Sequence, residues 1–271
     1  MSKEKLNHKS QKLSIQLSSD GFSFCVYNTN TKKYESITEL PFTSNISSPN
    51  RMLEEVKNTF KNNILLHNTY DEVVFIHHNE LSTFVPQSYF DQSLLSNYLQ
   101  NTVKVLDNDF ISYDELPLIK ANNVYIPFVN INNYIFDSFG TFTFLHSSTV
   151  FLNNILKTND ITFKRMFVNV YKNNFQLLVI ENNQLILSNC FDYQTEQDFV
   201  YYVLFVAEQL DMDPNLFILT LYGNIKETDE TYQLLYHYVR NVSIFATLNP
   251  SLGPDISCLP QAHFNLLQLH T

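Results

Sequence analysis

The strongest constraint on the fold of this chain is an order of predicted elements that occurs twice. Residues 12–18 and 22–26 alternate between apolar and polar side chains, which is the period of half-buried strands. A third strand and a helix beginning at Pro49 follow. The continuous apolar run at residues 73–76 then predicts a strand that is buried on both faces. The first half therefore reads strand, strand, strand, helix, strand.

The same order recurs from Lys164 onward. Three short alternating segments predict strands, and Thr195 with Asp198 three residues later is a capping box that begins a helix. The apolar run at residues 216–219 then matches the run at 73–76. Because the spacing between matched positions changes only gradually along the chain, we interpret the pattern as an old duplication.

We predict an α/β protein of two similar units, residues 1–160 and 161–271, each with a mixed sheet and helices on both faces. An irregular hairpin insertion is expected near residues 101–128. Its acids, which lack the spacing and the glycine of an EF-hand, predict a solvated loop rather than a cation site, and they are Asp107, Asp109, Asp114 and Glu115. Further helices are expected at 91–100, 129–139, 150–156 and 231–238, and further strands at 142–144, 242–245 and 263–269.

Charge and cysteine content exclude several classes of partner. The net charge of −10 repels nucleic-acid phosphates and anionic lipid surfaces. Three cysteines with no paired spacing indicate reduced thiols rather than a disulfide framework or a zinc site. The N-terminal residues lack an apolar leader, and the most apolar stretch, residues 199–210, is too short to span a bilayer. We expect a cytoplasmic protein.

The duplicated order is that of the ribonuclease-H-like unit in the superfamily of actin, hexokinase and heat-shock-chaperone ATPases. The amino-acid sequence of residues 12–25, from Lys12 through Asp20 to Cys25, resembles that of an uncharacterised bacterial domain-of-unknown-function family with this actin-like ATPase fold. A general resemblance extends to cytoplasmic actin-like subunits of pilus and secretion machines, which serve as assembly adaptors. The resemblance implies a fold, with no established activity attached to it.

Superfamily ATPases place an aspartate near the end of the first strand and a glycine and a hydroxyl in the turn after it. Backbone N–H groups there approach phosphate, while the carboxylate organises Mg²⁺ through water. Asp20, Gly21 and Ser23 keep these residue types, displaced into the turn. The resemblance therefore implies ATP and Mg²⁺ as candidate ligands of these three residues, whereas Asp-Gly by itself favours an ordinary hairpin turn.

The remaining nucleotide-binding features of the superfamily are weak or missing. The second phosphate loop needs an acid and several glycines, and residues 169–174 contain neither. The adenosine-contacting glycine pair is reduced to Gly223, which also fits a turn at a strand end. Since the chain has only 4 glycines and the first strand has no carboxylate, we expect neither ATP hydrolysis nor a metal-dependent nuclease.

Two other clusters invite a chemical interpretation. His77 and His78 are adjacent in a strand and point to opposite faces, so we expect a solvated strand end rather than a metal site. His146 beside Ser147 and Ser148 suggests a hydrolase, but no nucleophile elbow is present and Ser148 suits a helix N-cap. We therefore assign no catalytic and no metal-binding residues.

Two hypotheses of function follow. In the first, the chain is a degenerate, non-hydrolysing actin-like module that acts in protein binding or assembly, either with a partner or by self-association. In the second, it is a nucleotide-binding ATPase or kinase, whose ligands Asp20, Gly21, Ser23 and Gly223 meet across a cleft between the halves.

Overall fold

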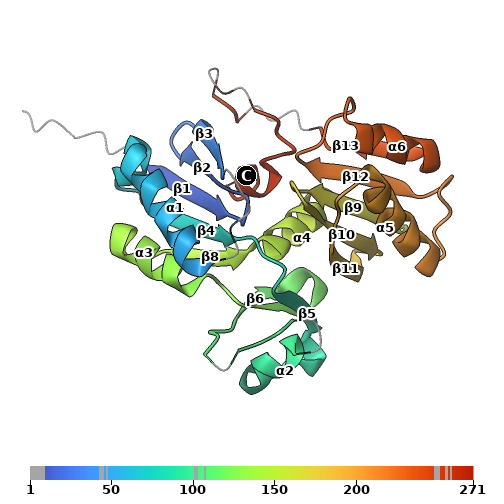
Figure 1. Cartoon of the computed structure of the whole chain (residues 1–271), viewed down its shortest axis with the longest axis horizontal. Helices are drawn as coiled ribbons and strands as arrows, with labels where there is room; N and C mark the ends of the chain where they lie inside the picture. The colour runs from blue at the N-terminus through green and yellow to red at the C-terminus, as the bar shows by residue number, and fades with distance from the viewer. Residues whose placement is uncertain are drawn as a thin grey trace, which may run out of the picture.

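The computed structural model is shown in Figure 1, coloured along the chain. It describes residues 10–42, 46, 48–100, 103–106, 108–246, 251–253, 256 and 258–270.

The first half is built on a five-stranded sheet in the order β3-β2-β1-β4-β8. The first three strands are antiparallel, and β4 and β8 continue the sheet in parallel with β1. Apolar side chains of α1 and α3 cover one face of this sheet. The elements are β1 (Gln11–Leu17), β2 (Gly21–Asn28), β3 (Lys33–Pro41), α1 (Pro49–Asn62), β4 (Glu72–His77), α3 (Val129–Phe139) and β8 (Thr143–His146).

The second half repeats this arrangement, with the sheet order β11-β10-β9-β12-β13. Its pairings have the same directions, and α5 and α6 cover one face. The predicted duplicated α/β fold is therefore confirmed. The elements are β9 (Arg165–Val170), β10 (Asn174–Glu181), β11 (Gln184–Asp192), α5 (Glu196–Gln209), β12 (Ile218–Gly223), α6 (Glu230–Tyr238) and β13 (Asn241–Ile244).

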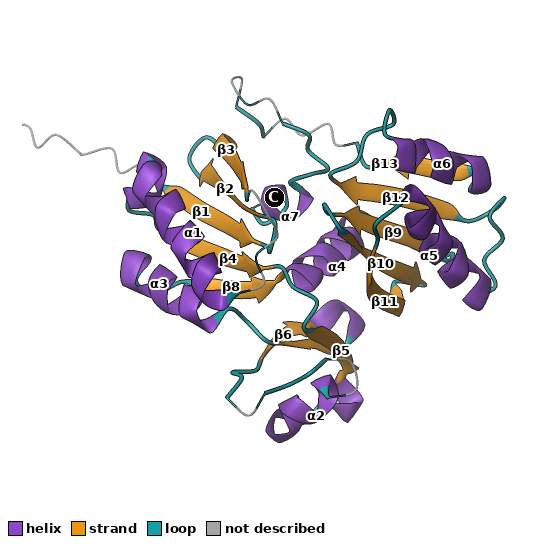
Figure 2. Cartoon of the chain, in the orientation of Figure 1, coloured by secondary structure: helices purple, strands orange, loops and turns teal. Residues whose placement is uncertain are grey.

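Helix α4 (Ser147–Thr158) lies between the two sheets, as Figure 2 shows. Its Val150 packs in a cluster with Cys25 and Ile76 of the first sheet. Its Phe151 packs in a cluster with Phe167 of the second sheet. One helix therefore packs apolar side chains against both sheets and joins the two halves.

A small antiparallel sheet in the order β5-β7-β6 follows β4. Its strands are β5 (Ser82–Pro86), β6 (Ser112–Leu116) and β7 (Ala121–Tyr125), and α2 (Leu95–Leu99) packs beside it. The helix expected at 91–100 is a 3₁₀ turn, Gln92–Leu94, followed by this short α-helix. The expected hairpin is formed by β6 and β7. It is not irregular, because β5 pairs with β7 and completes a regular sheet. Further 3₁₀ turns are Ile64–His67, Gln87–Tyr89 and Pro117–Ile119.

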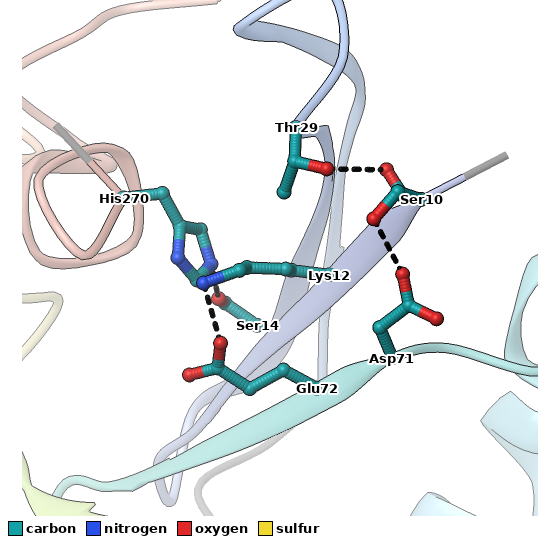
Figure 3. A network of polar contacts seen from close by, with 7 residues as sticks. All are labelled: Ser10, Lys12, Ser14, Thr29, Asp71, Glu72 and His270. Atoms are coloured by element: carbon teal, nitrogen blue, oxygen red, sulfur yellow. Dashed lines mark hydrogen bonds and ion pairs between the residues drawn. The ribbon is translucent and has the colours of Figure 1, made fainter.

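The last described segment crosses back to the first sheet. The strand expected at 263–269 is wrong, because this segment forms the short helix α7 (Phe264–Leu267) against β1 and β2. The hydroxyl of Tyr34 donates to the Leu267 carbonyl at 2.6 Å. Figure 3 shows His270 beside Ser14, and these side chains are hydrogen-bonded at 2.8 Å. The C-terminal segment, which follows the second half in the chain, therefore packs on the sheet of the first half and links the two.

Two helix ends predicted from local sequence signals are confirmed. Gly140, with φ 77°, ends α3 as predicted, and the Thr195–Asp198 capping box is formed at the start of α5. Within the described residues, no helix is both long enough and apolar enough to cross a membrane.

Candidate functional site

A cavity of about 330 Å³ lies between the β1–β2 turn of the first half and the ends of β9 and β12 in the second. Asp20, Gly21, Ser23 and Gly223, the four residues predicted as ligands, all line it. The fold therefore brings these positions together across the cleft.

The β1–β2 turn has the geometry of an ordinary hairpin. The N–H of Ser18 donates to the carbonyl of Gly21 at 3.0 Å, and the N–H of Phe42 donates to the carbonyl of Asp20 at 2.8 Å. The hydroxyl of Ser18 donates to the Asp20 carboxylate, which fixes the orientation of that side chain. The turn therefore presents the Asp20 carboxylate to the cavity in an orientation that the Ser18 hydroxyl fixes.

Gly223 is required by the packing of the backbone at the end of β12. It has a φ of 84°, and a Cβ atom there would lie 2.1 Å from the Val170 carbonyl oxygen. Its N–H donates to the carbonyl of Gln261 at 2.8 Å. Only glycine fits this close approach, so its presence is explained without a ligand.

The β9–β10 turn occupies the place of the second phosphate loop and presents an aromatic side chain. The N–H of Tyr171 donates to the Asn174 carbonyl at 2.9 Å, which closes a tight turn. The Tyr171 ring stacks on His78 of the first half, with ring centroids 3.7 Å apart. Its hydroxyl accepts a hydrogen bond from the Asn169 amide at 2.8 Å. This turn therefore joins the two halves through a side chain.

The charges around the cavity do not favour a polyphosphate. Asp20 and Glu39 contribute carboxylates, and Lys172 contributes an ammonium group. His263 lies 3.6 Å from Glu39, and burial lowers the pKa of this imidazole even though the carboxylate opposes the shift. Two carboxylates facing one ammonium group repel an anion unless a cation accompanies it.

The end of β4 is buried rather than solvated, which corrects the expectation for His77 and His78. The rings do point apart. His77 Nε2 bonds the Asn132 side-chain oxygen at 3.0 Å, and His78 Nδ1 bonds the Ser147 hydroxyl at 2.8 Å. Helices α3 and α4 and the Tyr171 ring of the second half cover this strand end, which the sequence alone leaves open.

His146, and not Ser148, is the N-cap of α4. The N–H of Ser148 donates to His146 Nδ1 at 3.2 Å, so Nε2 carries the proton and faces the Asn79 carbonyl at 3.1 Å. Burial lowers the pKa of His146 to about 3. Ser147 and His78 are likewise buried, and their side chains are hydrogen-bonded to each other.

Asp114 of β6 does not lie in the solvated loop that the sequence predicts. The expected solvated acid is buried, and it accepts hydrogen bonds from the His146 N–H (2.8 Å), the Thr149 hydroxyl (2.6 Å) and the Tyr125 hydroxyl (3.0 Å). Burial raises the pKa of this carboxyl to about 6. Asp114 thus ties the inserted sheet to α4, whereas Asp107 lies outside the described residues.

No group of three or more histidine, cysteine or acidic side chains is arranged to hold a metal ion among the residues that the structure describes.

The family of the chain follows from a comparison with known sequences. The model of the family described as "Protein of unknown function (DUF3822)" matches residues 2–242. The chain belongs to this family. Among curated protein sequences, none matches it.

Solved structures place this DUF3822 member in the actin-like ATPase fold. A Bacteroides thetaiotaomicron protein with that fold and unknown function is 22% identical, with a TM-score of 0.80 over 98% of this chain and 99% of that one. The PilM–PilN type IV pilus biogenesis complex matches with 8% identity and a TM-score of 0.64, over 96% of this chain and 97% of that one. At these identities the likeness concerns the fold alone.

Proposed function

We propose that this protein is a non-hydrolysing actin-like module that works by binding another protein. The observation that carries the proposal is the β9–β10 turn. Its Tyr171 ring stacks on His78 at 3.7 Å, and the turn holds neither the acid nor the glycines that a phosphate loop needs. The turn therefore stabilises the junction between the halves in place of a phosphate cradle.

Two further observations support the proposal. Gly223 serves backbone packing, and the cavity is lined by more carboxylates than ammonium groups. One solved structure of similar fold is that of PilM with PilN, a pilus biogenesis complex. A protein of this fold thus has a protein partner, and we extend that mode of action to the present chain.

Nucleotide binding is the second candidate, favoured by one observation. Asp20, Gly21, Ser23 and Gly223 line a single cavity with Lys172, and its volume of about 330 Å³ falls within the range of ligand pockets. In this alternative, Asp20 would hold Mg²⁺ through water and Lys172 would face the phosphates.

A thermal-shift titration with ATP, ADP and Mg²⁺ separates the two candidates. A ligand that binds only the native state stabilises it by about 2.7 kcal/mol at a hundredfold excess over its Kd. Our proposal predicts no shift at millimolar nucleotide. A Mg²⁺-dependent rise in melting temperature that Asp20→Ala abolishes would contradict the proposal and support nucleotide binding instead.

A further inference from the structure

A groove lies between the edge strand of the inserted sheet and the edge strand of the second large sheet. Strand β5 ends the small sheet, and β11 ends the second large sheet. Residues of both strands line one groove of about 680 Å³, with Gln176 and Ile119 also in its lining. Figure 1 shows β5 and β11 close together at this point. Sheet edges carry backbone groups that pair readily with another chain.

The pairing of β11 shows which of its backbone groups face the groove. The Tyr193 N–H donates to the Asn173 carbonyl at 3.0 Å, so this residue faces β10. Backbone groups alternate along a strand, and the register is regular from Leu187 to Asp192. Ser188 and Cys190 therefore face away from β10. Asp192 also faces away from β10 but does not line the groove. The Cys190 N–H donates to its neighbour's side chain, Asn189 Oδ1, at 2.9 Å, so Ser188 is the pairing position of this regular stretch that opens on the groove.

Other parts of the two edges are protected against pairing, as is usual in stable proteins. A register shift opposite Val179 and Ile180 places a bulge in β11 at Ile186. Pro86, which has no backbone N–H, ends β5. The open stretch is thus short and lies where the groove is lined by both strands.

A buried acceptor in the lining also points to a ligand. The side chain of Gln176 is 1% exposed, and its Oε1 atom has no hydrogen-bond partner among the described residues. Gln176 pairs with Cys190 across the β10–β11 ladder, so the two side chains lie on the same face of the sheet. Both residues line the groove. Buried acceptors are rarely left unpaired, and an N–H donor from a bound segment would satisfy this one.

The walls of the groove specify the character of that segment. Phe84 and Ile119 give it apolar contacts, and Ile186 is 43% exposed at its rim. Glu80 also lines it, and the carboxyl of Asp192 lies near enough to Glu80 to help raise the pKa of Glu80, after the larger effect of burial. Glu80 and Lys104 place one carboxylate and one ammonium group in the lining, so the walls themselves carry no net charge. The chain charge of −10 disfavours a second copy and favours a basic segment.

We propose that this groove binds an extended segment of a protein partner, which adds as a strand to the β11 edge at Ser188. Apolar side chains at alternate positions of the segment contact Phe84 and Ile119, and a basic side chain faces Glu80. The inference rests on the proposed protein-binding function and assigns it a surface and a partner chemistry.

A displayed library of random dodecapeptides, selected against the full chain, supplies the probe for the test. The most enriched peptide is synthesised with a fluorescein label, and its Kd is measured by anisotropy for the wild type, Ser188→Pro and Ser188→Ala. Proline is tolerated where an edge N–H faces solvent, so Ser188→Pro keeps the fold, which circular dichroism verifies, and removes only the pairing donor. Ser188→Ala keeps that donor and is the matched control.

We expect enriched peptides with alternating apolar residues and at least one lysine or arginine, a Kd at least tenfold weaker for Ser188→Pro, and an unchanged Kd for Ser188→Ala. Gln176→Met, which removes the buried acceptor at similar volume, is expected to weaken binding severalfold. Failure to enrich any peptide, or equal binding by Ser188→Pro, overturns the inference. Peptides that bind at another surface would overturn the inference but leave the proposed protein-binding function in place. Self-association of the wild type that Ser188→Pro abolishes would also overturn it, because the occupant of the groove would then be a second copy.

Discussion

Acidification from pH 7 to pH 5 is expected to destabilise the fold strongly, because three histidines at the junction of the halves are buried in their neutral form. Burial lowers the pKa of His77 to about 3, of His78 to about 4 and of His146 to about 3. His77 and His146 each also accept a backbone N–H at Nδ1, a bond that only the neutral ring can make.

The magnitude follows from proton linkage. Below a pKa of about 6.5 the unfolded chain binds protons that the folded chain excludes, so stability is present above that pH and is lost as the pH falls. Between pH 7 and pH 5 each histidine contributes a loss of about 2 kcal/mol. Asp114 acts in the opposite sense, since its pKa is raised to about 6 in the folded protein. It returns about 1 kcal/mol, which leaves a net loss of about 5 kcal/mol from these four groups. His270, whose pKa burial lowers to about 4, adds to the loss in the same direction.

Urea unfolding followed by far-ultraviolet circular dichroism at pH 7, 6 and 5 measures this loss, since the chain contains no tryptophan. His77→Gln is expected to reduce this loss by about 2 kcal/mol, whereas His67→Gln changes an exposed histidine and serves as the control. A change below 1 kcal/mol between pH 7 and pH 5 would refute the reasoning.

Three further perturbations test the packing. Gly223→Ala is expected to lower the free energy of unfolding by about 3 kcal/mol, from the backbone clash and the positive φ, whereas Gly140→Ala, with open space around it, costs about 1 kcal/mol; urea titration compares them. A double-mutant cycle between Tyr171→Leu and His78→Leu should give a coupling of about 1 kcal/mol, and additivity would contradict the stacking contact. Thr195→Ala should cost about 1 kcal/mol by removing the α5 cap, seen as a lower urea midpoint.

The duplicated fold was predictable because its signals are local. Alternation marks the hairpin strands, and the continuous apolar run at residues 73–76 marks β4, which has neighbours on both sides in the sheet. The glycine after α3 and the Thr195–Asp198 box end and begin helices through contacts within a few residues. Such features survive in a sequence of low identity to its relatives.

The errors arose where a distant segment decides the environment. Asp114 is buried because Tyr125 and the start of α4 surround it. His77 and His78 are buried because α3, α4 and the β9–β10 turn pack over the end of β4. The C-terminal apolar residues suited a strand, yet the β1–β2 surface they pack on accommodates helix α7. The stacking of Tyr171 on His78 joins residues far apart in the chain, and no local pattern signals it.

The most direct test of the central claim is phosphate release from ATP with Mg²⁺ by the purified chain, measured beside Asp20→Ala. The account predicts that both proteins release phosphate at the rate of buffer alone, because the cleft lacks the acid and the glycines of the second phosphate loop. Mg²⁺-dependent turnover by the wild type that disappears in Asp20→Ala would contradict the account and show that an enzyme operates with unorthodox ligands.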